Sequence, residues 1–166
     1  PNVKADAAAW ASQQTLLKKL SQNISDMHTA VNEVRRIKKS IEQYNELLKE
    51  KPGNEDLLLA GKTLITKLDA WEQNIVEVRI KNGQDVINWP SKLNAELFNL
   101  KRLADAHEPV VTEGVKTRAT DLENEWLTYK EQLNTGLRKD VDAYNTMFKN
   151  KNLPALMMKS GEMKTM

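Results

Sequence analysis

A long stretch without helix-breaking residues opens the sequence: from Ala5 to Lys49 there is neither proline nor glycine. Within it, apolar side chains recur at steps of three and four, at Leu16, Leu20, Ile24, Met27, Val31, Val34, Ile37, Ile41, Tyr44 and Leu48. Such steps place side chains on one face of an α-helix, because a turn takes 3.6 residues. The sequence therefore predicts one amphipathic helix of roughly 65 Å, at about 1.5 Å per residue.

Short turn sequences divide the rest of the chain into further helices. Pro52, Gly53 and Asn54 end the first helix, because proline cannot continue the hydrogen-bond ladder and asparagine can cap the next helix. A second helix is predicted over residues 55–81, ending at Asn82 and Gly83, with a stripe of Leu57, Leu58, Gly61, Leu64, Leu68, Trp71, Ile75 and Val78. An irregular segment up to Pro90 then precedes a short helix bearing Leu93, Leu97, Leu100 and Leu103, and residues 106–109 form the next turn.

The last long helix is predicted from Val110 or Thr112 to Lys149 and carries the most regular stripe of the chain. Its members are Val115, Ala119, Leu122, Trp126, Tyr129, Leu133, Leu137, Val141, Tyr144 and Phe148. Residues 153–156 are expected to fold back on the end of the bundle. Residues 1–157 then form a single helical domain, and residues 158–166 form a loosely held tail.

The helix lengths predict an all-α fold, an antiparallel bundle of long helices. The second and third helices together match the length of the first or the last one. The simplest packing is therefore a three-helix bundle whose middle helix is interrupted at residues 82–90. The alternative is a four-helix up-and-down bundle in which the third helix reverses direction.

Composition and charge exclude several classes of function. The chain is 40% hydrophobic and 29% charged, and its net charge of +2 is small because 25 cations and 23 anions are interspersed along the sequence. A nucleic-acid-binding protein usually concentrates its cations on one face, so no nucleic-acid partner is expected. No apolar stretch approaches the roughly 20 residues of a membrane span.

The sequence offers no set of residues for catalysis or metal binding. It has no cysteine, and neither of its two histidines, His28 and His107, has a carboxylate three or four positions before it. Helical metal sites usually pair histidine with glutamate at that spacing. Glycine-rich phosphate loops and the Gly-x-Ser-x-Gly motif are also absent. We therefore expect no enzyme activity, no metal and no cofactor.

Four tryptophans are the remaining candidates for a binding surface. Trp71 and Trp126 fall on the apolar stripes of their helices, which favours burial in the core. Trp10 precedes the regular stripe of the first helix, and Trp89 lies in the interruption. These two are therefore the aromatic candidates for contact with a partner.

The interruption also carries a resemblance to a known family. The stretch from Gly83 to Leu97, with Asp85, an apolar pair, Asn88, Trp89, Pro90 and then Lys92-Leu93-Asn94, resembles a segment of large exported bacterial proteins. These carry sortilin-like, BNR-repeat β-propellers and are often described as glycosyl hydrolases or exo-sialidase-like. Residues 1–6 and residues 153–156 resemble the flanks of the same region.

The resemblance implies a non-catalytic C-terminal accessory domain of a larger exported, glycosyl-hydrolase-like protein. Any glycosidase carboxylates would then belong to the propeller, and the partners would be other domains of the parent or another protein. The candidate interface residues are Trp10, Asp85, Asn88, Trp89 and Pro90, and a monomer is favoured. Two alternatives stay open: a free-standing helical adaptor or oligomerisation module, and a carbohydrate-binding unit that uses Trp10 or Trp89.

Overall fold

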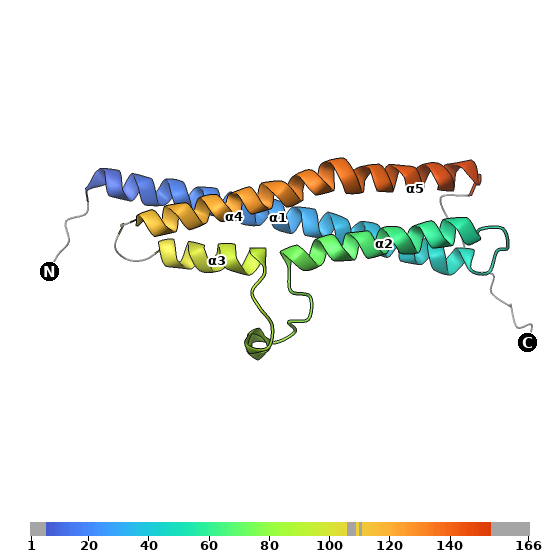
Figure 1. Ribbon diagram of the computed structural model, residues 1–166, viewed down its shortest axis with the longest axis horizontal. Coiled ribbons are helices and arrows are strands. Elements are labelled where there is room, and N and C mark those ends of the chain that lie inside the picture. Colours follow the sequence, from blue (N-terminus) through green and yellow to red (C-terminus); the bar gives the residue numbers. More distant parts are fainter. Residues whose placement is uncertain (1–5, 106–108, 110, 154–166) are drawn as a thin grey trace, which may run out of the picture.

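The computed structural model shows an elongated bundle, and the residues that it describes, 6–105, 109 and 111–153, contain helices and no strand (Figure 1). The predicted all-α fold is confirmed. The elements are α1 (Ala7–Leu48), α2 (Glu55–Ile75), the 3₁₀ helix η1 (Gly83–Ile87), α3 (Leu93–Ala104), α4 (Glu113–Glu131), the π-helix η2 (Gln132–Leu137) and α5 (Arg138–Asn150).

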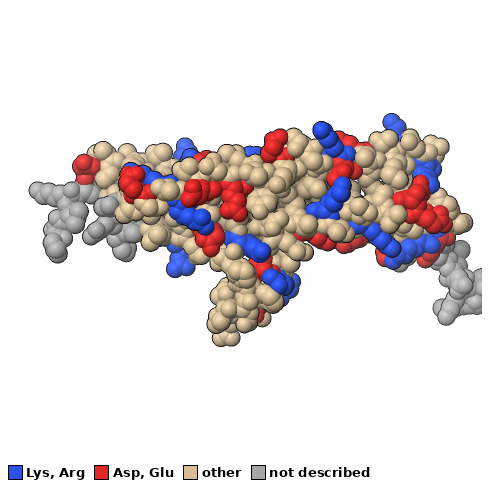
Figure 2. All heavy atoms as spheres, viewed as in Figure 1, with Lys and Arg blue, Asp and Glu red and all other residues tan. Residues whose placement is uncertain are grey.

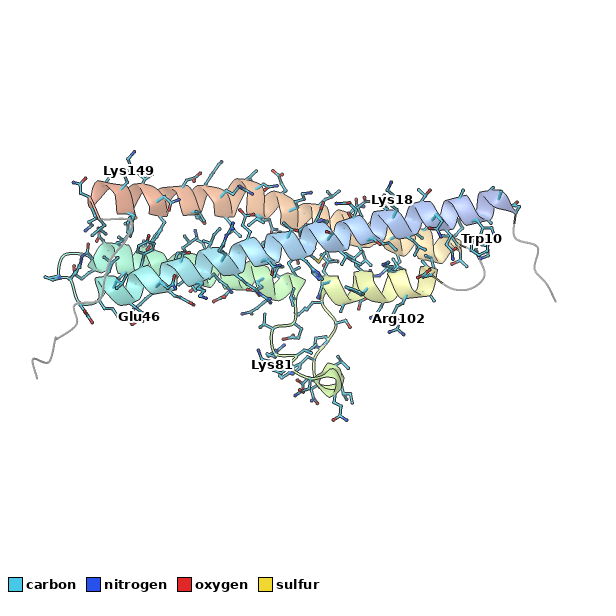
Figure 3. All side chains as sticks on the ribbon, turned by 180° about the vertical axis from the view of Figure 1, so that it is seen from behind. Trp10, Lys18, Glu46, Lys81, Arg102 and Lys149 are labelled. Atoms are coloured by element: carbon cyan, nitrogen blue, oxygen red, sulfur yellow. The ribbon has the colours of Figure 1, made fainter. Side chains whose placement is uncertain are left out.

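The helices form three rows. α1 makes the first row, α2 and α3 lie end to end in the second, and α4, η2 and α5 run without a break as the third (Figures 1 and 3). α1 packs against both α2 and α3, while α4 packs on α3 and α5 packs on α2. Because α3 continues in the direction of α2, the bundle has three rows with an interrupted middle, and the alternative with a reversed third helix is wrong.

The core follows the predicted stripes closely. Met27, Leu68, Leu97 and Trp126 are among the side chains with almost no exposure, and one cluster of buried residues runs the length of the bundle. Leu103 is an exception, since its spacing places it on the stripe of α3 but it is 64% exposed. Ala104 is buried in its place, and its carbonyl accepts a 2.8 Å hydrogen bond from the buried Gln13 side chain of α1.

The second helix is shorter than predicted. It ends at Ile75 rather than at Lys81, and Val76 adopts an extended conformation with φ −129° and ψ 135°. Val78 lies at helical spacing from Ile75, which makes the apolar pattern seem to continue. Glu77 instead accepts hydrogen bonds from both the backbone and the guanidinium of Arg79, an arrangement that competes with the helical ladder.

A close approach of α1 and α2 depends on Gly61. A Cβ atom at this position would lie 2.8 Å from Asn45 Oδ1 and 3.0 Å from Ile41 Cγ2. Both neighbours belong to α1 and are buried, so they have little room to move. Gly61 therefore serves contact between the helices and not backbone freedom.

The third row contains a π-helical turn that the sequence pattern did not predict. Leu133, Leu137 and Val141 are spaced four apart. In an ordinary α-helix, steps of four drift around the axis by about 40° each, and the wider η2 turn takes up that drift. The buried Trp71 of α2 donates its indole N–H to the Tyr129 carbonyl, just before η2, at 2.9 Å.

Some predictions lie outside the described residues. They are the turn containing His107, the fold-back of residues 154–156, the tail over residues 158–166 and the first five residues of the chain. Leu153 itself is described and packs, partly buried, against the core.

We predict that Trp126→Ala lowers the free energy of unfolding by about 3–5 kcal/mol, because the buried indole is lost and a cavity is left. The side chain is 1% exposed at the middle of the third row. Urea unfolding followed by circular dichroism measures the change. A loss below about 1 kcal/mol would contradict the position of Trp126 in the core.

We predict opposite signs for two glycine substitutions. Gly61→Ala should destabilise the fold by about 1–3 kcal/mol, because the new methyl group overlaps Asn45. Gly136→Ala should stabilise it by about 0.5–1 kcal/mol, because its Cβ meets nothing within 4 Å and alanine loses less backbone entropy. Thermal unfolding of the two variants in parallel tests this, and equal shifts would show that the approach at Gly61 is not tight.

Candidate functional site

The middle of the bundle carries a projecting loop, residues 76–92, which joins α2 to α3. It leaves the bundle sideways between the two helices and returns to the same row (Figure 1). In the face shown in Figure 2, most of the projection is uncharged, and cations and anions gather near its junction with the bundle. No other described segment between two helices projects in this way.

The outer half of the projecting loop is held by Asp85. Its carboxylate accepts hydrogen bonds from the backbone N–H groups of Lys81 at 2.7 Å and Asn82 at 2.8 Å. The Asn82 side chain in turn caps the first turn of η1, which completes a capping box. The two backbone donors hold the pKa of Asp85 below its usual value, so the carboxylate stays ionised near neutral pH.

The part of the loop next to the bundle is stabilised by contacts among Glu77, Arg79 and Trp89. Arg79 binds the Glu77 carboxylate through Nε and one terminal nitrogen, each at 2.6 Å. The same guanidinium lies 3.5 Å from the centroid of the Trp89 ring, a cation–π contact between the outgoing and returning halves of the loop. Hydrogen bonds from Arg79 lower the pKa of Glu77 to about 2.

The tip of the loop consists of two adjacent aliphatic residues. Val86 is 58% exposed and Ile87 is 83% exposed, and both belong to η1. The sequence predicts that residues 82–90 are ordered, because Val86, Ile87 and Trp89 offer apolar area that a solvated loop would not need, and hydrogen exchange is the test of that prediction. In the structure Val86 and Ile87 are exposed, and the contacts within the loop are the polar ones of Asp85 and Glu77.

The predicted interface residues therefore have different roles. The Asp85 carboxylate accepts a hydrogen bond from the backbone, and Trp89 is half-buried beside Arg79. Asn88 and Pro90 are exposed. Trp10 is 46% exposed but lies near the N-terminal end of α1, at a distance from the loop (Figure 3). The five residues do not form one surface, and the sequence analysis missed Val86 and Ile87 as the exposed pair.

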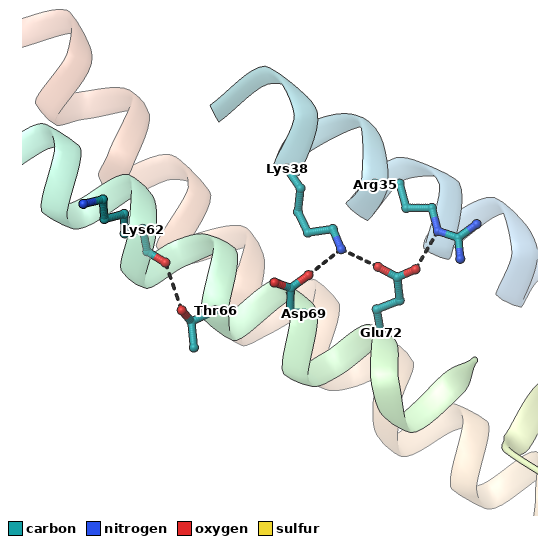
Figure 4. Close-up of polar contacts among 6 residues, drawn as sticks. All are labelled: Arg35, Lys38, Lys62, Thr66, Asp69 and Glu72. Carbon is teal, nitrogen blue, oxygen red and sulfur yellow. Dashed lines mark hydrogen bonds and ion pairs between the residues drawn. The ribbon is translucent and has the colours of Figure 1, made fainter. Parts of the chain in front are cut away.

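A charged cluster fixes the end of α2 from which the loop departs. The buried Glu72 carboxylate accepts hydrogen bonds from Arg35 Nε and Lys38 Nζ of α1, each at 2.5 Å (Figure 4). Lys38 Nζ also donates to the Asp69 carboxylate at 2.5 Å. Burial opposes ionisation of Glu72, but the bonds from Lys38 and Arg35 outweigh it and lower its pKa. Burial likewise disfavours the charge of Lys38, and the two carboxylates overcome that effect and raise its pKa.

The described residues contain no group of three or more histidine or carboxylate side chains that could bind a metal ion. His28 is exposed and stacks on Phe98 of α3, with 6.3 Å between the ring centroids. None of the described helices has the length and apolarity that a membrane-spanning segment requires.

Comparison of the chain with protein-family models, with curated proteins and with solved structures finds no match. The resemblance of residues 83–97 to exported β-propeller proteins therefore stays a prediction.

We predict that the ion pair between Glu77 and Arg79 persists at neutral pH and is lost only in acid. Because the pKa of Glu77 is lower in the folded protein than its usual 4.5, the contribution of its ionised form is complete above 4.5. That contribution is lost as the pH falls towards about 2. The NMR signal of the Arg79 Nε–H should titrate in this range and lose the titration in Glu77→Gln.

Glu125→Gln serves as the control, since Glu125 is exposed on α4 and forms no part of the loop. It should leave the Arg79 signal unchanged. In Glu77→Gln, amide exchange across residues 77–89 should accelerate at neutral pH. Unchanged exchange in that variant would show that the pair does not brace the loop.

Proposed function

We propose that this chain is a non-catalytic accessory module of a larger exported protein and that the projecting loop docks onto another domain of that protein. The observation that carries the proposal is that the aliphatic pair Val86 and Ile87 is exposed on a loop held by contacts of Asp85 and Arg79. Exposed aliphatic side chains on a loop held by internal contacts are typical of contact sites, because such a loop loses little conformational entropy when it binds a partner.

The chemistry of the loop favours a protein surface as its target. Near Val86 and Ile87 the exposed residues Asn82, Gly83, Gln84 and Asn88 are uncharged, while the charged residues of this stretch are the exposed Lys81 and the partly buried Asp85. Interface centres are depleted of charge and interface rims are polar. An aliphatic tip with an amide rim fits a shallow apolar pocket on a folded domain.

The carboxyl groups support a module without glycosidase activity. Four of the described carboxylates have a shifted pKa, namely Asp56, Glu72, Glu77 and Asp85, and all four shifts are downward. Glycoside hydrolysis ordinarily needs a general acid whose pKa is raised. These four groups are therefore suited to fixing the structure and not to protonating a leaving group.

The alternative of a carbohydrate-binding unit is less well supported. Sugar-binding aromatic side chains offer an open ring face, whereas one face of Trp89 is covered by Arg79 and the side chain is only partly exposed. Trp10 alone offers about half of its surface. The adaptor alternative differs from our proposal only in whether the partner belongs to the same polypeptide.

We predict that a photo-crosslinking amino acid at Ile87 of the full-length parent protein captures an upstream domain of the same chain. The matched control is Leu59, which is 66% exposed on the bundle, and a crosslinker there should capture much less. Mass spectrometry of the linked peptides identifies the contact. Val86→Asp should abolish the crosslink from Ile87, because a charge at an apolar interface must be desolvated.

The result separates the candidate functions. A crosslink from Ile87 to a different polypeptide would favour the adaptor, and a crosslink to a second copy would favour an oligomerisation module. Capture at Ile87 no stronger than at Leu59 would reject the loop as a docking site. Circular dichroism of each variant verifies that the bundle is folded.

A further inference from the structure

The projecting loop contains a chemically labile dipeptide, Asn82-Gly83. Of the six glycines in the chain, only Gly83 follows an asparagine. Asparagine before glycine is prone to deamidation, because the next backbone nitrogen can attack the side-chain amide and glycine has no side chain to hinder that attack. Both residues are exposed, at the outer end of the loop where η1 begins (Figure 1). Water therefore reaches the atoms that would react.

The fold does not itself require a glycine at position 83. A Cβ atom there would meet nothing within 4 Å. Its backbone also lacks the left-handed conformation that Gly53 adopts, with a φ of 83°. Gly83 is the first residue of η1, so its N–H has no partner within that helix. The nitrogen that would attack Asn82 is therefore not held by the helix.

Asp85 holds the backbone of Asn82 on both sides. The Asp85 carboxylate accepts a hydrogen bond from the Asn82 N–H at 2.8 Å, and the Asp85 N–H donates to the Asn82 carbonyl at 3.0 Å. Asn82 is extended, with a ψ of 159°. Bringing the Gly83 nitrogen to the side-chain carbon of Asn82 requires rotation about ψ, which turns the Asn82 carbonyl away from the Asp85 N–H. Reaction at Asn82 therefore requires the capping box to open.

We propose that Asn82 is a deamidation site and that Asp85 limits its rate by keeping the Asn82 backbone extended. When the capping box opens, the Gly83 nitrogen loses its proton and bonds to Cγ of Asn82, and Nδ2 leaves with a proton as ammonia. The product is a cyclic succinimide. One water molecule then opens the ring at either carbonyl carbon, which gives aspartate or isoaspartate at position 82. This site does not depend on the docking proposed above.

The two products have different effects on the loop. Aspartate is a favourable capping residue, so the backbone bonds around position 82 can form again. In isoaspartate the main chain runs through the side-chain carbons, which places one extra atom between the N–H of residue 82 and Gly83. The two hydrogen bonds that residue 82 exchanges with Asp85 then no longer fit together. Isoaspartate therefore releases η1 and with it the exposed pair Val86 and Ile87.

Incubation of the whole chain in mildly alkaline buffer, followed by peptide mass spectrometry that separates aspartate from isoaspartate, tests the proposal. We expect conversion at Asn82 ahead of every other asparagine. Asp85→Ala should accelerate it about tenfold, because a hydrogen bond to a charged group no longer opposes opening. Asp121→Ala is the matched control, since Asp121 is exposed on α4 and lies outside the loop. It should leave the rate unchanged.

Gly83→Ala tests the chemistry without disturbing the fold, because its methyl group has room but hinders the attacking nitrogen. Conversion should become several-fold slower than in the unchanged chain. Circular dichroism verifies that the bundle of each variant is folded. A different asparagine reacting first, equal rates for Asp85→Ala and Asp121→Ala, or no slowing by Gly83→Ala would overturn the proposal.

Hydrogen exchange of the purified isoaspartate form tests the effect on the loop. Amides of residues 77–89 should exchange faster than in the unmodified chain, while those of α1 should not change. Unchanged exchange over residues 77–89 would show that the loop does not depend on the Asn82 backbone, and the assignment of Asp85 as the rate-limiting contact would then be wrong.

Discussion

The length of α1 is the constraint on which the rest of the structure depends. This single helix has 42 residues and an apolar face along most of that length, which must be covered for the fold to be stable. α2 has 21 residues and α3 has 12, so neither can cover α1 alone. Placing them end to end meets the requirement and leaves a joint in the second row, and the joint is where residues 76–92 leave the bundle.

The buried Glu72 carboxylate near this joint fixes the position of α2 on α1 more than it stabilises the fold. Removing Glu72 from water is costly, and its pairing with Arg35 and Lys38 offsets that cost without a large net gain. Such a cluster has one acceptable geometry, since a shift of α2 along α1 would leave a buried carboxylate without its partners. We infer that the cluster sets the register of α2 on α1 and hence the place from which the loop departs.

The sequence predicted the parts of the fold that depend on apolar spacing, and it failed where polar contacts or local geometry decide. The stripes through Met27 and Trp126 are buried as expected. The end of α2 was misplaced because Val78 continues the spacing, whereas Glu77 and Arg79 break the helix. At the site, Asp85 was singled out through the resemblance and Trp89 as an aromatic residue of the interruption, but only the three-dimensional arrangement shows that both make contacts within the loop that carries Val86 and Ile87.

The π-turn lies where the close packing of the third row gives way to hollows on the surface of the bundle. Hollows on both sides of this row begin at η2, since Leu133 and Leu137 line one and Thr135 and Gly136 line another. The Tyr129 carbonyl, just before η2, is held by the indole of Trp71 on the neighbouring helix. π-turns are often found where a helix departs from close packing at a functional site. In this bundle the same turn that keeps Leu133, Leu137 and Val141 in line also marks the boundary beyond which α5 has open grooves on either side.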